Sequence, residues 1–292
     1  MKLDPDALIQ FAAVAEEASF TKAAARLRVA QPWLSLRIRR LEGYLGFPLF
    51  DRTTRRVQLT ERGAEFLEAA KRIADALTSA EAMADRLQRR DQRRIRIGAP
   101  PYSAEIPERS ILIARLAEQD RDLVIELDIG WTPILMDRLR RGDLDLAFAL
   151  APPPMEDLEA HRLTGIALDV VMPGDDPLAG ERQVRPDQLA KRKVGVFTRS
   201  LHPTLHDRLF KPLSLAGADL VQMPEISSSM SERVGRGEML MAIFACSGLP
   251  KQDIALERRS LMVDMTDFSI VRHRGDRSKI VETAWRLATG SA

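Results

Sequence analysis

The stretch that decides the fold is residues 19–62, SFTKAAARLRVAQPWLSLRIRRLEGYLGFPLFDRTTRRVQLTER. Its first half holds two amphipathic helical patterns, and Ser19 and Pro32 are residue types that begin helices. After Gly46, the segment 51–60 alternates as a short β-hairpin does. Two helices, a tight turn and a hairpin in this order predict a winged helix-turn-helix.

Another helix, of about 14 residues, is expected ahead of this stretch, because Asp4 and Pro5 form a capping and first-turn signal. In the helix that begins near Pro32, one apolar stripe recurs at spacings of 4, 3 and 4 residues, and it consists of Leu34, Ile38, Leu41 and Leu45. This stripe is expected to face the core, which leaves a basic side exposed.

Cations are concentrated on that exposed side and around the hairpin. A single arginine is more often a solvated surface charge, but clustering on two elements favours contact with DNA. Gln31 and Ser35 are expected to read bases, and the arginines to divide between bases and phosphates. The residues expected at the DNA interface are Thr21, Lys22, Gln31, Pro32, Trp33, Ser35, Leu36, Arg37, Arg39, Arg40, Arg52, Thr53, Arg55 and Arg56.

Residues 15–63 also match a family pattern, AxxxSFTKAAxxLxVxQPxLSxxIxxLExxLGxPLFxRTxRxVxLTxxG. The pattern resembles the N-terminal domain of LysR-type transcriptional regulators, which implies binding to promoter DNA. Three positions depart from it. Ala30 stands where a capping serine is usual, Trp33 where a small residue is usual, and Leu36 where arginine or another polar residue is common.

These departures leave alternatives open. Without a cap at Ala30, the helix loses about 1 kcal/mol of local stability unless another group substitutes. Trp33 either packs beside the hairpin or contacts DNA. Trp33 and Leu36 could touch thymine methyl groups or sugar edges, which would alter sequence preference without abolishing binding.

Composition is that of an ordinary globular chain of two or more domains, with 292 residues, 45% of them hydrophobic and 29% charged. Residues 1–62 carry 11 Lys and Arg against 7 Asp and Glu, so the net charge of +2 hides a local +4. The start has no secretory signal pattern, and no stretch approaches the roughly 18 apolar residues of a membrane span. A cytoplasmic location is expected. Cys246, the single cysteine, cannot form an internal disulfide and is expected in the core.

One long helix is expected from Thr60, a capping residue, to about Arg90. Its apolar residues recur at alternating spacings of 4 and 3, which favours a seam between two helices over a helix packed on one domain. The seam, through which two copies would form a homodimer, consists of Phe66, Ala70, Ile73, Leu77, Ala80, Ala84 and Leu87. Assembly into a homotetramer is implied only by the family resemblance.

After the basic segment 89–94, strand and helix patterns alternate, which predicts a mostly parallel sheet and an α/β class. Two such sets with crossing strands would make two lobes and a cleft. Segments 94–100, 140–150 and 175–179 resemble the effector-binding domain of the same family, similar in fold to periplasmic binding proteins. The expected domains are a winged helix-turn-helix at 1–59, a dimerisation linker helix at 60–92, and an effector-binding domain at 93–292, with lobe I at about 93–162 and 265–292 and lobe II at about 163–264.

Ligands of open α/β sheets bind at the carboxyl ends of strands, near helix N-termini. Hydroxyls, an arginine and aromatic rings in those loops suit an organic or aromatic acid. The alternative is that the serines and threonines cap helices and the aromatics are core. The residues expected at the effector site are Pro101, Tyr102, Ser103, Trp131, Thr132, Phe197, Thr198, Arg199, Ser200, His202, Ser227 and Ser228.

Enzymatic interpretations fail on context, so no catalytic residue, metal site or cofactor is expected. Ser19 and Lys22 have the Ser-x-x-Lys spacing of penicillin-recognising enzymes, but their companion motifs are missing. His202 and His206 stand four apart without a third ligand, and a capping His202 with an exposed His206 is expected instead. The expected partners are promoter DNA, a small effector, further copies of the chain and, for an activator, RNA polymerase. The rival hypothesis is a small-molecule binding or transport module without DNA function.

Overall fold

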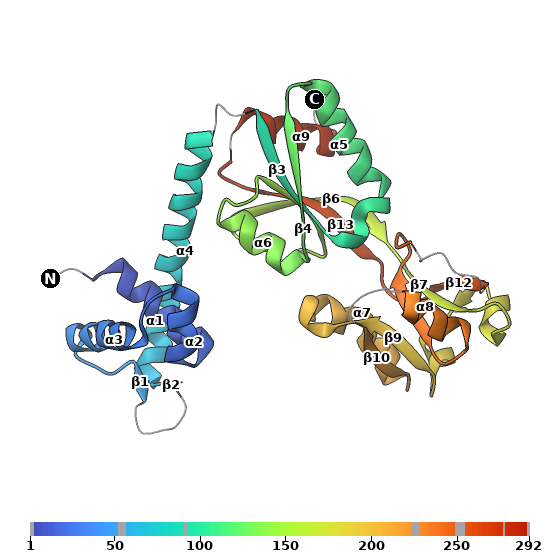
Figure 1. Ribbon diagram of the computed structural model, residues 1–292, viewed down its shortest axis with the longest axis horizontal. Helices are drawn as coiled ribbons and strands as arrows, with labels where there is room; N and C mark the ends of the chain where they lie inside the picture. The colour runs from blue at the N-terminus through green and yellow to red at the C-terminus, as the bar shows by residue number, and fades with distance from the viewer. Residues whose placement is uncertain are drawn as a thin grey trace. The chain divides into compact units, whose positions relative to one another are not determined.

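A computed structural model describes residues 3–51, 57–89, 93–223, 228–248, 255–276 and 278–290 (Figure 1). The chain divides into two compact units, residues 1–84 and 85–292. No helix within the described ranges combines the length and the apolar character that crossing a membrane requires.

The N-terminal unit begins with three helices, α1 (Pro5–Glu17), α2 (Phe20–Leu27) and α3 (Gln31–Leu45). The Asp4 carboxylate accepts from the amide of Asp6, and the Ser19 hydroxyl accepts from that of Lys22, so the expected caps of α1 and α2 are confirmed. At Ala30 no side chain caps α3. The expected hairpin is present as β1 (Phe50–Asp51) and β2 (Gln58–Leu59), which pair antiparallel, while its turn at 52–56 lies outside the described residues.

Aromatic rings join the helices of this unit to the hairpin and to α4 (Glu61–Arg89). The Phe11 ring is fully buried and lies 5.4 Å from the Phe50 ring and 6.0 Å from the Phe66 ring, centroid to centroid. The Thr60 hydroxyl accepts from the amide of Gly63 at 2.9 Å and caps α4 as expected. The first turns of α4 therefore belong to the core of the N-terminal unit.

Lobe I is a five-stranded sheet of order β4-β3-β5-β13-β6. Helix α6 covers one face of the sheet, and α5 and α9 cover the other (Figure 1). Alternate residues of each strand point to opposite faces, so Phe148 packs toward α5 and α9 while Ala147 and Ala149 pack toward α6. The elements are β3 (Arg94–Ala99), β4 (Val124–Ile129), β5 (Leu146–Leu150), β6 (Leu158–Ile166), β13 (Thr266–His273), α5 (Pro107–Gln119), α6 (Thr132–Arg140), α9 (Lys279–Thr289) and the 3-10 turn η1 (Pro101–Glu105).

Lobe II is a six-stranded sheet of order β10-β9-β11-β7-β12-β8, with α7 on one face and α8 on the other. Its strands are β7 (Leu168–Pro173), β8 (Gln183–Val184), β9 (Lys193–Phe197), β10 (Asp219–Met223), β11 (Leu240–Phe244) and β12 (Leu256–Leu261). Its helices are α7 (Pro203–Leu215), α8 (Ser228–Gly235) and the 3-10 turns η2 (Pro177–Gly180), η3 (Pro186–Leu189) and η4 (Arg199–Leu201).

The expectation of mostly parallel sheets is wrong in part, because both sheets are mixed. β13 runs antiparallel to both β5 and β6, and β7 runs antiparallel to both β11 and β12. These strands lie where the chain passes from one lobe to the other, so they enter each sheet against the direction of its βαβ strands. The edge strands β6 and β8 were not expected, because half-exposed edges carry a weak apolar pattern.

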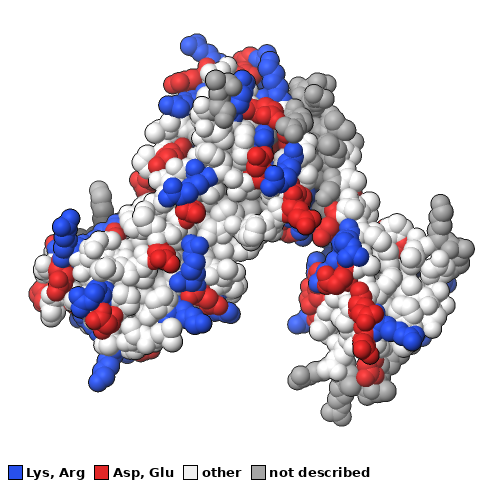
Figure 2. Space-filling view, turned by 180° about the vertical axis from the view of Figure 1, so that it is seen from behind, with Lys and Arg blue, Asp and Glu red and all other residues white. Residues whose placement is uncertain are grey.

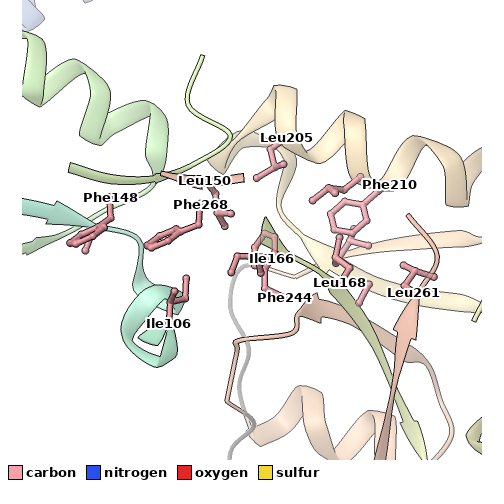
Figure 3. Packing of buried hydrophobic residues seen from close by; sticks show 14 of the residues in the cluster. Ile106, Phe148, Leu150, Ile166, Leu168, Leu205, Phe210, Phe244, Leu261 and Phe268 are labelled. Atoms are coloured by element: carbon pink, nitrogen blue, oxygen red, sulfur yellow. The ribbon is translucent and has the colours of Figure 1, made fainter. Parts of the chain in front are cut away.

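A single apolar core runs through both lobes. Leu150 at the end of β5, Ile166 at the end of β6 and Leu168 at the start of β7 connect Phe268 of lobe I to Phe210 of lobe II (Figure 3). Close packing at this point fixes the ends of the strands from which a ligand site would be built.

Candidate functional site

The exposed face of α3 is the first candidate site. Leu34, Ile38 and Leu41 are buried as expected, and the opposite side is open to solvent. Arg39 and Arg40 are exposed there and form no ion pair with any described residue. Several of the expected DNA contacts are exposed, either on this side of α3 or at the start of α2. They are Thr21, Lys22, Gln31, Pro32, Trp33, Leu36, Arg39 and Arg40.

Other expected DNA contacts are already engaged within the unit. The Arg37 guanidinium pairs with Asp4 and lies 5.3 Å above the centroid of the Trp33 ring. The Gln31 amide donates to the Ser35 hydroxyl at 2.8 Å. The expected contacts in the hairpin turn, Arg52, Thr53, Arg55 and Arg56, lie outside the described residues.

By contrast, charge is mixed on the C-terminal unit. On the face drawn in Figure 2, lysine and arginine alternate with aspartate and glutamate over the described surface of both lobes. Residues 63–292 carry the remaining net charge of −2, since the whole chain is +2 and residues 1–62 are +4. An anionic partner therefore has its electrostatic attraction at the N-terminal unit.

The seam expected on α4 is divided by the structure. Ala70 is buried and Phe66 is partly buried against the N-terminal core, whereas Ile73, Ala80 and Ala84 are exposed. Leu77 is partly buried, and the side chain of Leu87 lies outside the described residues. The exposed part of the seam remains a prediction of helix pairing.

The second candidate site is a cavity of about 450 Å³ lined by residues from both lobes. Four rings form a continuous aromatic wall in it. Tyr102 lies 5.5 Å from Trp131 and 4.6 Å from Phe244, while Phe197 lies 5.7 Å from Trp131 and 6.0 Å from Phe244. Tyr102 and Trp131 belong to lobe I and the two phenylalanines to lobe II, so the wall crosses between the lobes.

Of the residues expected at the effector site, Pro101, Tyr102, Trp131 and Phe197 line this cavity. Ser103 is buried elsewhere, where its hydroxyl donates to the carbonyl of Pro100 and accepts from Arg109 Nη1 at 2.8 Å. The Thr132 hydroxyl accepts from the amide of Leu150 at 3.1 Å. Both hydroxyls therefore bond groups inside lobe I, and neither caps a helix as the alternative interpretation expects.

The polar residues expected in lobe II are absent from the cavity lining as far as the structure describes them. The Thr198 hydroxyl donates to the carbonyl of Met223 at 3.0 Å, and exposed Arg199 pairs with Asp207 at 2.6 Å. That pairing lowers the pKa of Asp207 to about 2. Ser200 is exposed, Ser227 lies outside the described residues, and Ser228 begins α8.

Sequence reasoning missed much of the lining. Phe244, Ser247 and Gly248 follow or end β11, so the strand-end rule applied to that strand would have found them. Leu168 pairs with Phe244 across the antiparallel β7–β11 ladder, which no local pattern indicates. The other lining residues that were missed are Ala104, Glu105, Met223, Ala242 and Ile243.

Few polar groups face this apolar space. The hydroxyls of Tyr102 and Ser247 are buried without a hydrogen-bond partner among the described residues, and Glu105 is the one charged lining residue in that part of the chain. Burial raises the pKa of the Tyr102 phenol well above its usual value, and the Thr132 hydroxyl is its polar neighbour. Beside it, burial raises the pKa of Cys246 to about 11, so this thiol stays protonated.

His202 joins the lobes. Its Nδ1 accepts from the amide of Leu205 at the start of α7, and its Nε2 lies 3.1 Å from the carbonyl oxygen of Leu150 in lobe I. Nε2 therefore carries the proton. His206 was expected to be exposed, and this is wrong, because its ring is buried against Phe197 and Phe210.

Stability of the C-terminal unit is expected to fall at mildly acidic pH because of His202. Burial lowers the pKa of His202 below its usual 6.5, so the unfolded chain binds the proton more readily. The stabilisation that neutral His202 gives the folded state is complete above pH 6.5. It is lost progressively as the pH falls from 6.5 to the folded-state pKa, and it stays lost below that pKa. Urea denaturation at pH 7.5 and 5.5 should show a smaller pH dependence for His202→Gln than for the parent chain. His161→Gln, which changes a histidine outside this contact, is the control, and equal pH dependence in all three proteins would contradict the assignment.

Comparison with known proteins agrees with this architecture. A family described as bacterial regulatory helix-turn-helix protein, lysR family, matches residues 5–64, and a LysR substrate binding domain matches residues 88–231. The chain is 35% identical over 179 residues to the Hca operon transcriptional activator HcaR of Escherichia coli K12, an alignment that covers 61% of this chain and 60% of HcaR.

Two further relatives align over more of their length. IlvR of Caulobacter vibrioides is 31% identical over 242 residues, covering 77% of this chain and 78% of IlvR. BudR of Raoultella terrigena is 29% identical over 286 residues, covering 93% and 95%.

Solved structures share the fold. Full-length BenM matches with a TM-score of 0.59 at 24% identity, covering 99% of this chain and 96% of BenM. Full-length OxyR of Pseudomonas aeruginosa matches with a TM-score of 0.56 at 20% identity, covering 98% and 99%. The resemblance found in residues 15–63 is thereby confirmed: the chain belongs to the LysR family of bacterial regulatory helix-turn-helix proteins.

Proposed function

We propose that this chain is a DNA-binding transcription regulator whose binding to promoter DNA responds to a small-molecule effector held between its two C-terminal lobes. The observation that carries the proposal is the combination, in one LysR-family chain, of a basic exposed helix face and a cavity lined by both lobes. The protein would act in the cytoplasm as a dimer or tetramer, and as an activator it would also contact RNA polymerase.

The lining of the cavity supports an aromatic effector. A planar ring would pack against Tyr102, Trp131, Phe197 and Phe244, where offset and edge-to-face contacts are favourable. We propose an aromatic acid. Its carboxylate would lie at the N-terminal end of α6, since Trp131 is both the N-cap of that helix and a lining residue, and free amides there attract anions. Glu105 opposes the negative charge, so the carboxylate is the part of this proposal that needs its own test.

The response to an effector would be a shift between lobe arrangements. An effector changes an equilibrium only if it binds one arrangement more tightly than another. Because the aromatic wall takes two rings from each lobe, a ligand inserted among these rings contacts both lobes at once. The affinity of the ligand then depends on the spacing between the lobes, so the ligand binds one lobe arrangement more tightly than another.

Trp131→Ala is expected to weaken binding of an aromatic effector at least tenfold, about what loss of a large buried contact area costs. Isothermal titration would use benzoate, 4-hydroxybenzoate and 1-naphthoate as the aromatic acids, with benzamide and cyclohexanecarboxylate to separate the ring from the charge. Trp33→Ala, which removes a tryptophan outside the cavity, is the matched control and should bind these compounds as the parent does.

The outcomes separate the parts of the proposal. If benzoate and benzamide bind equally, the proposed role of the carboxylate is wrong and the role of the aromatic ring stands. If cyclohexanecarboxylate binds as tightly as benzoate, the proposed role of the aromatic ring is wrong. The DNA function is tested on the same proteins by gel shift with the chain's own upstream region at stated salt concentrations. A small-molecule module without DNA function would show no salt-dependent shift, while a regulator keeps that shift in Trp131→Ala.

A further inference from the structure

Leu36 lies at the centre of the exposed face of α3. Residues of an α-helix are spaced about 100° apart around its axis, which puts Leu36 about 180° from the middle of the buried stripe of Leu34, Ile38 and Leu41. Leu36 is 45% exposed, and Trp33, one turn earlier on the same side, is 44% exposed. Residues three apart are neighbours on a helix surface, so the two form one apolar patch.

The patch lies within the part of the helix that is expected to enter the major groove, and its surroundings are cationic. Arg39 and Arg40, three and four residues after Leu36, are exposed and pair with no described carboxylate. The Arg37 guanidinium pairs with Asp4 and stacks on the Trp33 ring, and this contact orients the indole. Arg37 was expected to contact DNA, and these two interactions already engage it. The helix face thus has an apolar centre, Leu36 and Trp33, with the cations Arg39 and Arg40 near it. Such a face complements DNA, which has charged phosphates and an apolar group in its major groove.

We propose that Leu36 and Trp33 read the 5-methyl group of thymine in the major groove of the operator. This inference rests on the proposed DNA-binding function. Among the base edges of the major groove, the thymine methyl is the apolar feature, and the other groups are hydrogen-bond donors and acceptors. A leucine side chain offers no hydrogen bond to those groups, so its contribution to sequence preference comes from burying that methyl group against it.

The alternative for Trp33, packing beside the hairpin, involves the turn at 52–56, which lies outside the described residues. The Arg37 guanidinium of the same helix lies over the Trp33 ring, and almost half of the Trp33 surface is exposed. Trp33 is therefore available to cover one side of the methyl group that Leu36 contacts.

The test uses the full-length chain and a duplex selected from random sequence by that chain. Each thymine of a half-site is replaced in turn by deoxyuridine, which removes the methyl group and changes no hydrogen-bonding group. At one or two positions the parent chain should bind about three- to fivefold more weakly, the effect of exposing one methyl-sized apolar group. Leu36→Ala should bind the thymine and uracil duplexes equally, and Leu36→Met should keep the difference.

A control variant and a control base separate this role from general damage. Ser35→Ala should lower affinity for both duplexes while keeping their ratio, because it removes a polar contact beside the patch. A 5-methylcytosine duplex that carries a methyl group at the sensitive position should recover part of the lost affinity in the parent chain but not in Leu36→Ala.

Two failures are distinguishable. If no duplex is selected and binding shows no salt dependence, the DNA-binding function itself is wrong. If a duplex is selected but no thymine is sensitive to demethylation, or if Leu36→Ala keeps the sensitivity, DNA binding stands and methyl reading by this patch is overturned.

Discussion

Gly63→Ala is expected to lower the free energy of unfolding of the N-terminal unit by about 3 kcal/mol or more. A Cβ atom at Gly63 would lie 2.1 Å from the carbonyl oxygen of Leu49 and 3.0 Å from its carbonyl carbon. Both atoms are main chain, and the same carbonyl accepts from the amide of Thr60 at 3.0 Å. To relieve the clash, α4 would have to move away from Leu49, the residue directly before β1.

Denaturation by urea, with hydrogen exchange and mass spectrometry to locate the loss, would measure this effect. The matched control is Gly43→Ala on α3, where an added Cβ meets nothing within 4 Å and alanine favours a helix by about 1 kcal/mol. Gly43→Ala should leave stability unchanged or raise it. If Gly63→Ala unfolded at the same urea concentration as the parent, the close approach of α4 to Leu49 would be incorrect.

Asp145→Ala is expected to destabilise the C-terminal unit by about 3 kcal/mol, the cost of breaking a mostly buried ion pair from one side. The Asp145 carboxylate accepts from the amide of Arg96 at 2.7 Å and from its guanidinium at 2.7 and 3.2 Å. The two side chains are 16% and 13% exposed, so water screens the pair little. Without Asp145, the Arg96 guanidinium keeps its bond to the carbonyl of Gly142 and loses the Asp145 carboxylate as an ion-pair partner.

Comparison with an exposed pair isolates the effect of burial. Asp137 pairs with Arg141 one helical turn away, and both side chains are at least half exposed, so Asp137→Ala should cost at most about 0.5 kcal/mol. Thermal denaturation of the two variants should separate them clearly. Equal shifts would mean that the bonds of Asp145 to β3 contribute no more than a surface ion pair does.

Residues 4–62 show how much a sequence determines when the interactions are local. The caps at Asp4, Ser19 and Thr60 and the buried stripe of α3 were all predicted. Caps act over two or three residues and helical periodicity over four, so the chain itself contains both partners of each interaction. The missing cap at Ala30 was visible for the same reason.

At the cavity, prediction succeeded for rings and not for the hydroxyls. Tyr102, Trp131 and Phe197 line it because each ends a strand or follows one closely, a position that strand patterns locate. Thr132 and Thr198 come directly after Trp131 and Phe197, but each hydroxyl bonds a main-chain group of another segment. Whether a hydroxyl faces a ligand or secures backbone depends on partners far along the chain, which no local pattern contains.

By itself the sequence determined the family, the winged helix-turn-helix, the helices and the two-lobed α/β class, because these follow from dense motifs and short-range periodicity. Only the tertiary structure decided the mixed direction of the sheets, the entry of Phe244 into the aromatic wall, the pairing of Arg37 with Asp4 and the need for glycine at 63. Each of the last three joins residues that are 14 to 142 positions apart. Such contacts arise when close packing brings whole elements together, so their geometry is a property of the folded chain and not of any segment.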